Sequence, residues 1–296
     1  IVSLPSLDNK KVVITGANRG LGYEIAKFCL SKNASVVLAC RNPNRAEFAK
    51  ENLIKDFPNA KIDILLYSQD KISSCYQFVD NLFLHHSDFY ALVLNAGILN
   101  AKKGELNEDG LPLVSGTNSF GLLAIMDALN ERLSHLENEH RIIIQGSLAA
   151  FLSKYKNVQK SLQNPNKGNF YQYNNSKNAA VNIFNFYATN NKNVNVKFLL
   201  AEPGISSTNI VRNYPKWFRG IAKGAMRVLF QSAKAGALPT DYLLTSNVNN
   251  GDYYKPKHLK GVKGLPKKGK LKKKYLNSSI DEMREVINNL TKKDEN

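Results

Sequence analysis

The segment Thr15–Gly22 constrains this chain more than any other, because three glycines follow a short apolar run and open an expected helix. The run Val12–Ile14 reads as a buried strand, and Gly16, Gly20 and Gly22 come after it. One glycine permits a sharp turn, and another lets backbone approach a pyrophosphate without a Cβ in the way. The helix N-terminus adds free N–H groups and the positive end of its dipole. We therefore predict a dinucleotide-binding turn rather than an ordinary glycine-rich loop.

Apolar β-prone runs alternate with amphipathic stretches along most of the chain. The expected strands are Lys11–Thr15, Ser35–Ala39, Lys61–Leu66, Ala91–Leu94, Arg141–Ile144 and Val194–Leu200. The expected helices lie near 20–32, 43–56, 73–86, 110–134 and 171–190. Short continuous apolar strands separated by helices indicate a parallel sheet covered on both faces. We predict an α/β fold with a Rossmann-type doubly wound parallel sheet that binds ligands at the carboxyl ends of its strands.

The alternation ends after Leu200, and no change of composition marks a second domain. We expect one dinucleotide-binding catalytic domain over residues 1–254, with a helical substrate lid at about 203–250 and a short last strand at 251–254. A basic extension over 255–296 follows, with a helix from about Ser278 to Leu290. Residues 255–274 hold ten lysines and no acidic residue, so they carry ten of the seventeen net positive charges.

The composition argues against several classes of protein. Cys29, Cys40 and Cys75 each fall inside an expected helix or strand, so we expect small buried thiols in a reducing compartment. Neither they nor the five histidines show metal-ligand spacing, and we predict no metal site. No run approaches the roughly 18 apolar residues that span a bilayer, and the first residues do not read as a signal peptide. We expect a cytoplasmic protein.

Tyr173 and Lys177 form the pattern that carries chemistry. They lie four residues apart in an expected helix, so their side chains share one helix face. A tyrosine phenol has a pKa of about 10, and proton transfer near pH 7 requires lowering it by about 3 units, or about 4 kcal/mol. An ammonium about 4 Å away supplies on the order of 4 kcal/mol at an effective dielectric of about 20. We therefore predict that Tyr173 is the acid/base and that Lys177 lowers its pKa.

This spacing is a weak signal alone, and Tyr67 with Lys71 forms a second match. That pair follows the third expected strand, so we interpret it as a surface coincidence. A polar side chain should also hold the reacting carbonyl group. Ser147 follows the fifth expected strand, at the end where ligands bind. Ser161 is closer to Tyr173 in sequence but has no strand before it, so we favour Ser147.

Two further polar positions draw attention. Asn118 lies inside the helix expected at 110–134, where asparagine is unfavourable, so we expect it to have a specific partner. A local backbone hydrogen bond at a kink is the simpler interpretation. Asn95, Ala96 and Gly97 close the fourth strand, and small residues there let backbone approach a ligand. A plain turn would have the same composition.

The charge near the end of the second strand bears on the cofactor. An acidic residue there binds the ribose 2′-hydroxyl of NAD, whereas an arginine suits the 2′-phosphate of NADP. Arg41 occupies that position, and Arg19 lies within the glycine turn. Because arginine pairs well with phosphate, we predict NADP as the cofactor.

These motifs, in this order, resemble the short-chain dehydrogenase/reductase superfamily, and its single-domain branch in particular. The resemblance covers about residues 10–210. Within the branch, Ala39–Asn42 and the long gap between Ser147 and Tyr173 are similar to retinol-dehydrogenase-type and related carbonyl-reducing members. The segments 251–254 and 264–266 are also similar to that group.

The resemblance implies a role for each matched residue. Tyr173 would be the acid/base, Lys177 would also touch the nicotinamide ribose, Ser147 would orient the substrate oxygen, and Asn118 would hold a water of the proton relay. The glycines would receive the pyrophosphate, and Asn95 would contact the adenosine ribose region. The full set of expected cofactor-binding residues is Gly16, Asn18, Arg19, Gly20, Leu21, Gly22, Arg41, Asn95, Ala96, Gly97, Tyr173, Lys177, Pro203, Gly204 and Thr208.

Two positions depart from the family pattern on the adenine side. Ser68 stands where the family has an aspartate after the third strand, and Leu94 replaces the first asparagine of its Asn-Asn-Ala-Gly element. These departures concern the affinity for the cofactor rather than the chemistry.

We expect an NADP-dependent oxidoreductase that transfers a hydride between the nicotinamide and a small-molecule carbonyl or alcohol. Aromatic residues in 148–170 and 205–240 favour an apolar, bulky substrate. The alternative is a non-catalytic protein that senses NADP or docks on a membrane surface through the basic C-terminal region. We expect no nucleic-acid partner, because residues 255–274 are not interleaved with aromatic residues as nucleic-acid sites are. The sequence leaves the oligomeric state open.

Overall fold

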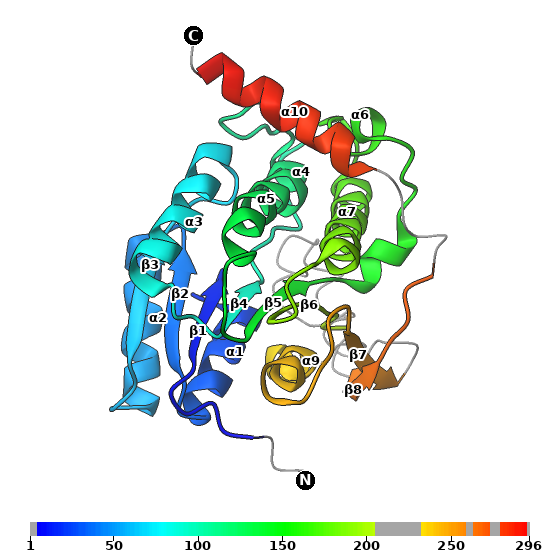
Figure 1. Cartoon of the computed structure of the whole chain (residues 1–296). Helices are drawn as coiled ribbons and strands as arrows, with labels where there is room; N and C mark the ends of the chain where they lie inside the picture. Colours follow the sequence, from blue (N-terminus) through cyan, green and yellow to red (C-terminus); the bar gives the residue numbers. More distant parts are fainter. Residues whose placement is uncertain (1–4, 205–231, 259–262, 273–278, 295–296) are drawn as a thin grey trace, which may run out of the picture.

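The computed structural model describes residues 5–204, 232–258, 263–272 and 279–294. Its centre is one eight-stranded sheet between two layers of helices (Figure 1). The strand order is β3-β2-β1-β4-β5-β6-β7-β8, and only β8 runs antiparallel to its neighbour. The strands are β1 (Lys11–Thr15), β2 (Ser35–Cys40), β3 (Ile62–Leu66), β4 (Ala91–Leu94), β5 (His140–Gln145), β6 (Val196–Ala201), β7 (Tyr253–His258) and β8 (Lys263–Lys268).

The helices pack on the sheet as two separate hydrophobic cores. One face is covered by α1 (Gly20–Ser31), α2 (Pro43–Asp56) and α9 (Ala233–Thr245). The other is covered by α3 (Ile72–His86), α5 (Gly121–Leu133) and α7 (Asn169–Asn190), with α10 (Ser279–Asp294) lying across them (Figure 1). The shorter elements are α4 (Leu113–Ser115), the π-helical turn η1 (Gly116–Phe120), the 3-10 helix η2 (Leu148–Leu152) and α6 (Val158–Ser161).

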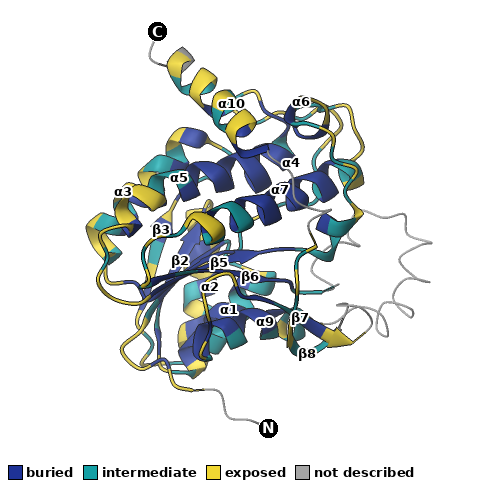
Figure 2. Ribbon diagram, turned by 45° about the vertical axis from the view of Figure 1, so that its right-hand side comes forward, coloured by how far each residue is buried: buried dark blue, intermediate teal, exposed yellow. Residues whose placement is uncertain are grey.

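The central strands are apolar throughout because both of their faces are covered. All residues of β5 are buried, with Ile142 and Ile144 in one core and Ile143 in the other. Figure 2 shows the same dark interior on both sides of the sheet. This burial explains why the strands read as continuous apolar runs rather than as an alternation.

The predicted α/β doubly wound fold is confirmed, and the six long expected strands all form. β7 extends to His258, beyond the strand expected at 251–254, so the boundary that the sequence suggested after Tyr254 falls inside a strand. β8 lies within the lysine stretch and was not predicted. Within the expected lid, α9 forms at Ala233–Thr245, and residues 205–231 lie outside the described part of the chain.

The helix expected over 110–134 is interrupted. A short helical turn at Leu113–Ser115 is followed by the π-helical turn at Gly116–Phe120, and the regular helix begins only at Gly121. The three cysteines are buried and unpaired, as predicted. Among the described residues, no helix is long and apolar enough to cross a membrane.

Candidate active site

The predicted site residues gather where the parallel strands end. The hydroxyl of Thr15, the last residue of β1, accepts hydrogen bonds from the backbone N–H groups of Asn95 and Ala96, each at 2.9 Å. The Asn95 side chain donates to the Thr15 carbonyl at 2.8 Å. These hydrogen bonds hold the end of β4 against the glycine turn, and the Asn95 side chain is used to form them.

The glycine turn fits a pyrophosphate. Gly16 and Gly20 have φ angles of +66° and +59°, which side-chain-bearing residues rarely adopt. A Cβ on Gly22 would lie 2.6 Å from both the Gly16 carbonyl oxygen and the Asn95 side-chain nitrogen, so only glycine lets α1 approach this closely. Arg19 precedes α1, and its side chain does not cap the helix. The N–H groups in the first turn of α1 are therefore able to donate hydrogen bonds to an anion.

Asn118 lies in the π-helical turn and reaches across to the chain after β4. Its side-chain oxygen accepts from the Ile98 N–H at 2.8 Å, and its amide donates to the Ile98 carbonyl at 2.7 Å and to the Ser176 hydroxyl at 3.0 Å. π-Helical turns within helices are frequent at functional sites. The expected kink and specific partner are both present, and the partner is distant in sequence rather than local.

The Lys177 side chain reaches the carboxyl end of β5. Its ammonium donates to the backbone carbonyl of Gln145, the last residue of β5, at 3.1 Å. A Cβ on Gly97 would lie 3.5 Å from this ammonium and 3.0 Å from the Asn118 side-chain oxygen, so Lys177 and Asn118 flank the same small space. Burial lowers the pKa of Lys177 to about 8, because the low-dielectric interior disfavours the charged ammonium.

Tyr173 lies one helical turn before Lys177 on α7. Burial raises the pKa of its phenol above the usual value, and a hydrogen bond with the Ser147 side chain opposes that shift. The expected lowering of this pKa by Lys177 is therefore not what the structure shows, since burial dominates and the ammonium is engaged by the Gln145 carbonyl. Ser147 also accepts a hydrogen bond from the Ala149 N–H at 3.2 Å, which caps η2.

The structure separates the two candidate serines. Ser161 is 3% exposed, and its hydroxyl accepts a hydrogen bond from the Lys156 N–H at 2.8 Å. It therefore stabilises its own loop, whereas Ser147 contacts Tyr173. The second Tyr-x-x-x-Lys match is not on the surface as expected, because Tyr67 is buried and stacks on Phe78 with ring centroids 4.4 Å apart.

Comparison with known proteins places the chain in a family. A family model described as short chain dehydrogenase matches residues 10–218. The chain belongs to the short-chain dehydrogenase family. Members of this family are oxidoreductases that bind nicotinamide cofactors.

The curated relatives in the family are distant. A WW domain-containing oxidoreductase from Gallus gallus is 28% identical over 178 residues, which is 58% of this chain but 42% of that protein. The chloroplastic short-chain dehydrogenase TIC 32 B from Brassica napus is 26% identical over 250 residues, 80% of this chain and 77% of that protein. The chain thus spans less than half of the first relative and about three quarters of the second.

Solved structures share the fold. An uncharacterised protein from Mycobacterium paratuberculosis superposes with a TM-score of 0.73 at 22% identity, covering 98% of this chain and 96% of that one. An NADPH-dependent 3-quinuclidinone reductase from Rhodotorula rubra superposes with a TM-score of 0.63 at 20% identity, covering 84% of this chain and 90% of that one. At these identities the likeness establishes the fold alone.

Beyond the carboxyl ends of β2 and β3, where the sequence places the adenine side of the site, lies a contact that the sequence did not predict. The Arg41 guanidinium donates to the Asp70 carboxylate at 2.5 Å, and the Ser68 hydroxyl donates to the other oxygen of Asp70 at 2.5 Å. Arg41 is largely exposed and Asp70 is partly buried. Arg19 is also exposed. Asp70 follows β3 in a loop, and nothing in the local sequence indicated that it would meet an arginine from the end of β2.

The end of β6, before the predicted cofactor-binding residues Pro203 and Gly204, holds a second unexpected group. Glu202 directly follows β6 and is 1% exposed. Tyr253 donates a hydrogen bond to one of its carboxylate oxygens at 2.5 Å, and within the described residues the other oxygen has no partner. Burial raises the pKa of Glu202 to about 7. Nothing in the sequence indicated that this acidic residue would be buried.

The remaining predicted residues that the structure describes lie after β6 and around the glycine turn. Gly204 has a φ of +67° and follows Pro203 after β6, while Asn18, Leu21 and Ala96 are partly buried around the turn. Thr208 lies outside the described residues. Within the described residues, no group of three or more His, Cys, Asp or Glu side chains could hold a metal ion.

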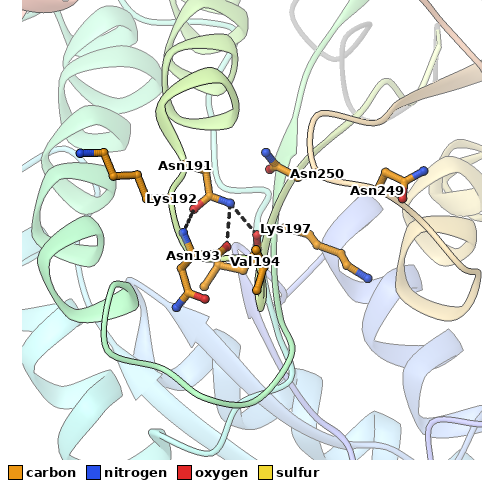
Figure 3. Close-up of a pocket in the computed structure, with 8 residues that line it drawn as sticks. Asn191, Lys192, Asn193, Val194, Lys197, Asn249 and Asn250 are labelled. Carbon is orange, nitrogen blue, oxygen red and sulfur yellow. Dashed lines mark hydrogen bonds between the residues drawn. The ribbon is translucent and has the colours of Figure 1, made fainter.

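A pocket at the opposite end of the sheet is built by asparagines (Figure 3). The Asn191 side chain donates to the carbonyls of Asn193 at 3.0 Å and Val196 at 2.7 Å. The Asn250 side chain accepts from the Phe198 N–H at 3.0 Å. These carboxamides hold the loops before β6 and β7, so we assign the pocket a structural role.

Proposed function

We propose that the protein is an NADP-dependent oxidoreductase that interconverts an apolar carbonyl compound and its alcohol. The observation that carries the proposal is the meeting of Ser147, Tyr173, Lys177 and Asn118 at the edge of the sheet that also holds the glycine turn. When bound, the nicotinamide supplies or accepts the hydride. The residues of the chain supply binding, orientation and proton transfer.

The phenol of Tyr173 is the group that exchanges the proton of the substrate oxygen. The interaction of Tyr173 with the Ser147 side chain supports a site in which a carbonyl oxygen can accept hydrogen bonds from both hydroxyls. Such donors stabilise the negative charge that grows on that oxygen during reduction. Ser147 is held in place by the Ala149 N–H, so its orientation is set before substrate binds.

Lys177 and Asn118 support the phenol from behind. The Gln145 carbonyl fixes the ammonium at the end of β5, where Lys177 can hold ribose hydroxyls of the bound cofactor. Two hydrogen bonds to the backbone of Ile98 fix the Asn118 side chain. Asn118 and Lys177 both lie beside Gly97, so they provide fixed polar groups for a proton relay there.

The preference for NADP rests on Arg41 and Arg19. Both are exposed at the adenosine end of the site, and a guanidinium matches a phosphate in geometry and charge. Arg41 is the exposed partner of its ion pair with Asp70, and ion pairs at the surface contribute about 0–1 kcal/mol, so a 2′-phosphate can compete for the guanidinium. The structurally similar Rhodotorula reductase is NADPH-dependent, which agrees with this preference.

The proposal is tested by measuring the binding of NADPH and NADH and then the oxidation of NADPH with a panel of aldehydes, ketones and retinoids. We expect tighter binding of NADPH and turnover of at least one apolar carbonyl compound. Equal or tighter binding of NADH would reject the cofactor assignment. NADPH binding without turnover of the panel would favour a cofactor-sensing protein.

A further inference from the structure

The β7–β8 hairpin carries positive charge that the described residues do not neutralise. Several basic side chains elsewhere in the fold pair with carboxylates, as Lys11 does with Asp88. In the hairpin and the residues after it, Lys268 pairs with Asp252 at 2.5 Å. The other described lysines of this segment form no ion pair with a described carboxylate: Lys255, Lys257, Lys267, Lys270 and Lys272. Lys255 is partly buried, its ammonium lies 5.9 Å from the centre of the Tyr253 ring, and its charge opposes the rise in the pKa of the buried Glu202.

The register of the hairpin concentrates this charge on one face. Lys255 on β7 lies directly opposite Lys267 on β8, and like charges in such a pair are destabilising. Leu265 lies two residues before Lys267, so it shares that face, and it is 69% exposed. The opposite face packs on α9, where the rings of Tyr254 and Tyr242 lie 4.6 Å apart. The hairpin therefore presents a basic face that also carries an exposed apolar residue.

This face lies at the same end of the sheet as the candidate site. β7 runs parallel to β6, so its final residues, Lys257 and His258, lie at the carboxyl edge of the sheet. Two more exposed apolar side chains belong to segments of the site: Leu152 at the end of η2 is 58% exposed, and Phe170 on the first turn of α7 is 65% exposed. In Figure 2 the hairpin forms the outer edge of the sheet.

We propose that this hairpin face docks on an anionic phospholipid bilayer and turns the candidate site toward the membrane surface. Lipid headgroups would supply counter-charges to lysines that form no ion pair in the described fold, and Leu265 would enter the interfacial region. The proposal stands apart from the proposed reaction, but it agrees with an apolar substrate, which partitions into the same bilayer.

Two other roles account less well for this face. Single-stranded nucleic acid is bound by exposed aromatic rings as well as by cations, whereas Tyr253 is buried and Tyr254 packs on α9. Lysines on an edge strand also prevent pairing with other chains. The charge on β8 alone would achieve that, without the cost of a second lysine directly opposite on β7.

The test is sedimentation of the full chain with vesicles of phosphatidylcholine, with and without phosphatidylserine, at low and high salt. The variant replaces Lys255, Lys257 and Lys267 by glutamine. A control variant replaces Lys61, Lys103 and Lys192 by glutamine. These lysines are exposed in other parts of the fold, so the control removes the same amount of charge. Circular dichroism and NADPH binding verify that each variant is folded.

We expect the wild-type chain to bind phosphatidylserine vesicles and to be released by salt. The hairpin variant should lose about 100-fold in affinity, because each of the three lysines near an anionic surface contributes about 1 kcal/mol, and the control should lose little. Leu265→Ser should weaken binding at high salt as well as at low salt. Failure of the wild-type chain to bind, equal losses in both triple variants, or tighter binding to a DNA oligonucleotide than to vesicles would each overturn the proposal.

Discussion

The guanidinium of Arg41 and the carboxylate of Asp70 lie 2.5 Å apart at the adenosine end of the candidate site. The residue that should bind a 2′-phosphate is therefore already held by an anion of the protein itself. Asp70 orients Arg41, but it also competes with the phosphate and repels it.

Substitutions at this pair should change the affinity for NADP without changing the affinity for NAD. Arg41→Ala should weaken NADPH binding by about 10- to 100-fold, since a hydrogen bond to a charged group contributes about 1.5–3 kcal/mol. Asp70→Asn should tighten it severalfold, because the competing charge is removed. Calorimetric titration with both cofactors measures the changes, and Lys61→Ala removes a distant positive charge as the control. If Asp70→Asn weakens NADPH binding, Asp70 orients Arg41 more than it competes.

Gly22→Ala should disrupt the phosphate cradle. A Cβ at this position would lie 2.6 Å from backbone and side-chain atoms, and overpacking of this kind costs about 1–3 kcal/mol. We expect a lower melting temperature and weaker NADPH binding. Gly168→Ala is the matched control, because a Cβ there would meet nothing within 4 Å. Equal behaviour of the two variants would show that the close approach of α1 is not needed.

Lys177 should make the protein more stable at alkaline pH. Its pKa is about 8 in the folded state and 10.5 in a free lysine, so between these values the unfolded chain binds more protons. Stability should then rise with pH across that window, by about 3 kcal/mol in total. Lys177→Met should lose this rise, as measured by urea unfolding at several pH values. The same slope in the variant as in the wild type would contradict the burial of a charged lysine; exposed Lys192→Met serves as the control.

Glu202 should have the opposite effect on the acid side. Its pKa of about 7 in the folded state lies above the usual 4.5, so stability should fall as pH rises from 4.5 to 7. Glu202→Gln keeps an acceptor for Tyr253 and should stabilise the protein by about 3 kcal/mol at pH 8, with little effect at pH 4. Melting temperatures at both values test this, with the exposed Glu51→Gln as the control. A stabilisation that does not depend on pH would mean that Glu202 is ionised in the folded protein.

The sequence was informative where local pattern determines structure. The buried strands and the glycine turn follow from runs such as Val12–Ile14, because a strand covered on both faces must be apolar throughout. The unfavourable position of Asn118 in a helix indicated an irregular turn, and η1 is that turn. β8 could not be predicted in the same way, since its lysines and Pro266 are typical of a solvated segment rather than of a strand.

The contacts that arise only in the folded chain were not predictable. Asp70 meets Arg41 because β2 and β3 end side by side, and the local sequence of neither residue indicates this. Glu202 is buried because Tyr253 arrives from the next strand. The preference for Ser147 over Ser161 could be argued from the strand before it, but its contact with Tyr173 depends on how η2 and α7 pack.

The central claim is that the Tyr173 phenol transfers the proton of the substrate oxygen. The most direct measurement is the rate of NADPH oxidation by Tyr173→Phe with a carbonyl substrate that the wild type reduces, together with NADPH binding on the same sample. Tyr171→Phe, two residues earlier on α7, is the matched control. We predict that Tyr173→Phe loses about 10²- to 10⁴-fold in rate while it still binds NADPH, and that the control keeps the wild-type rate. A wild-type rate in Tyr173→Phe would contradict the account.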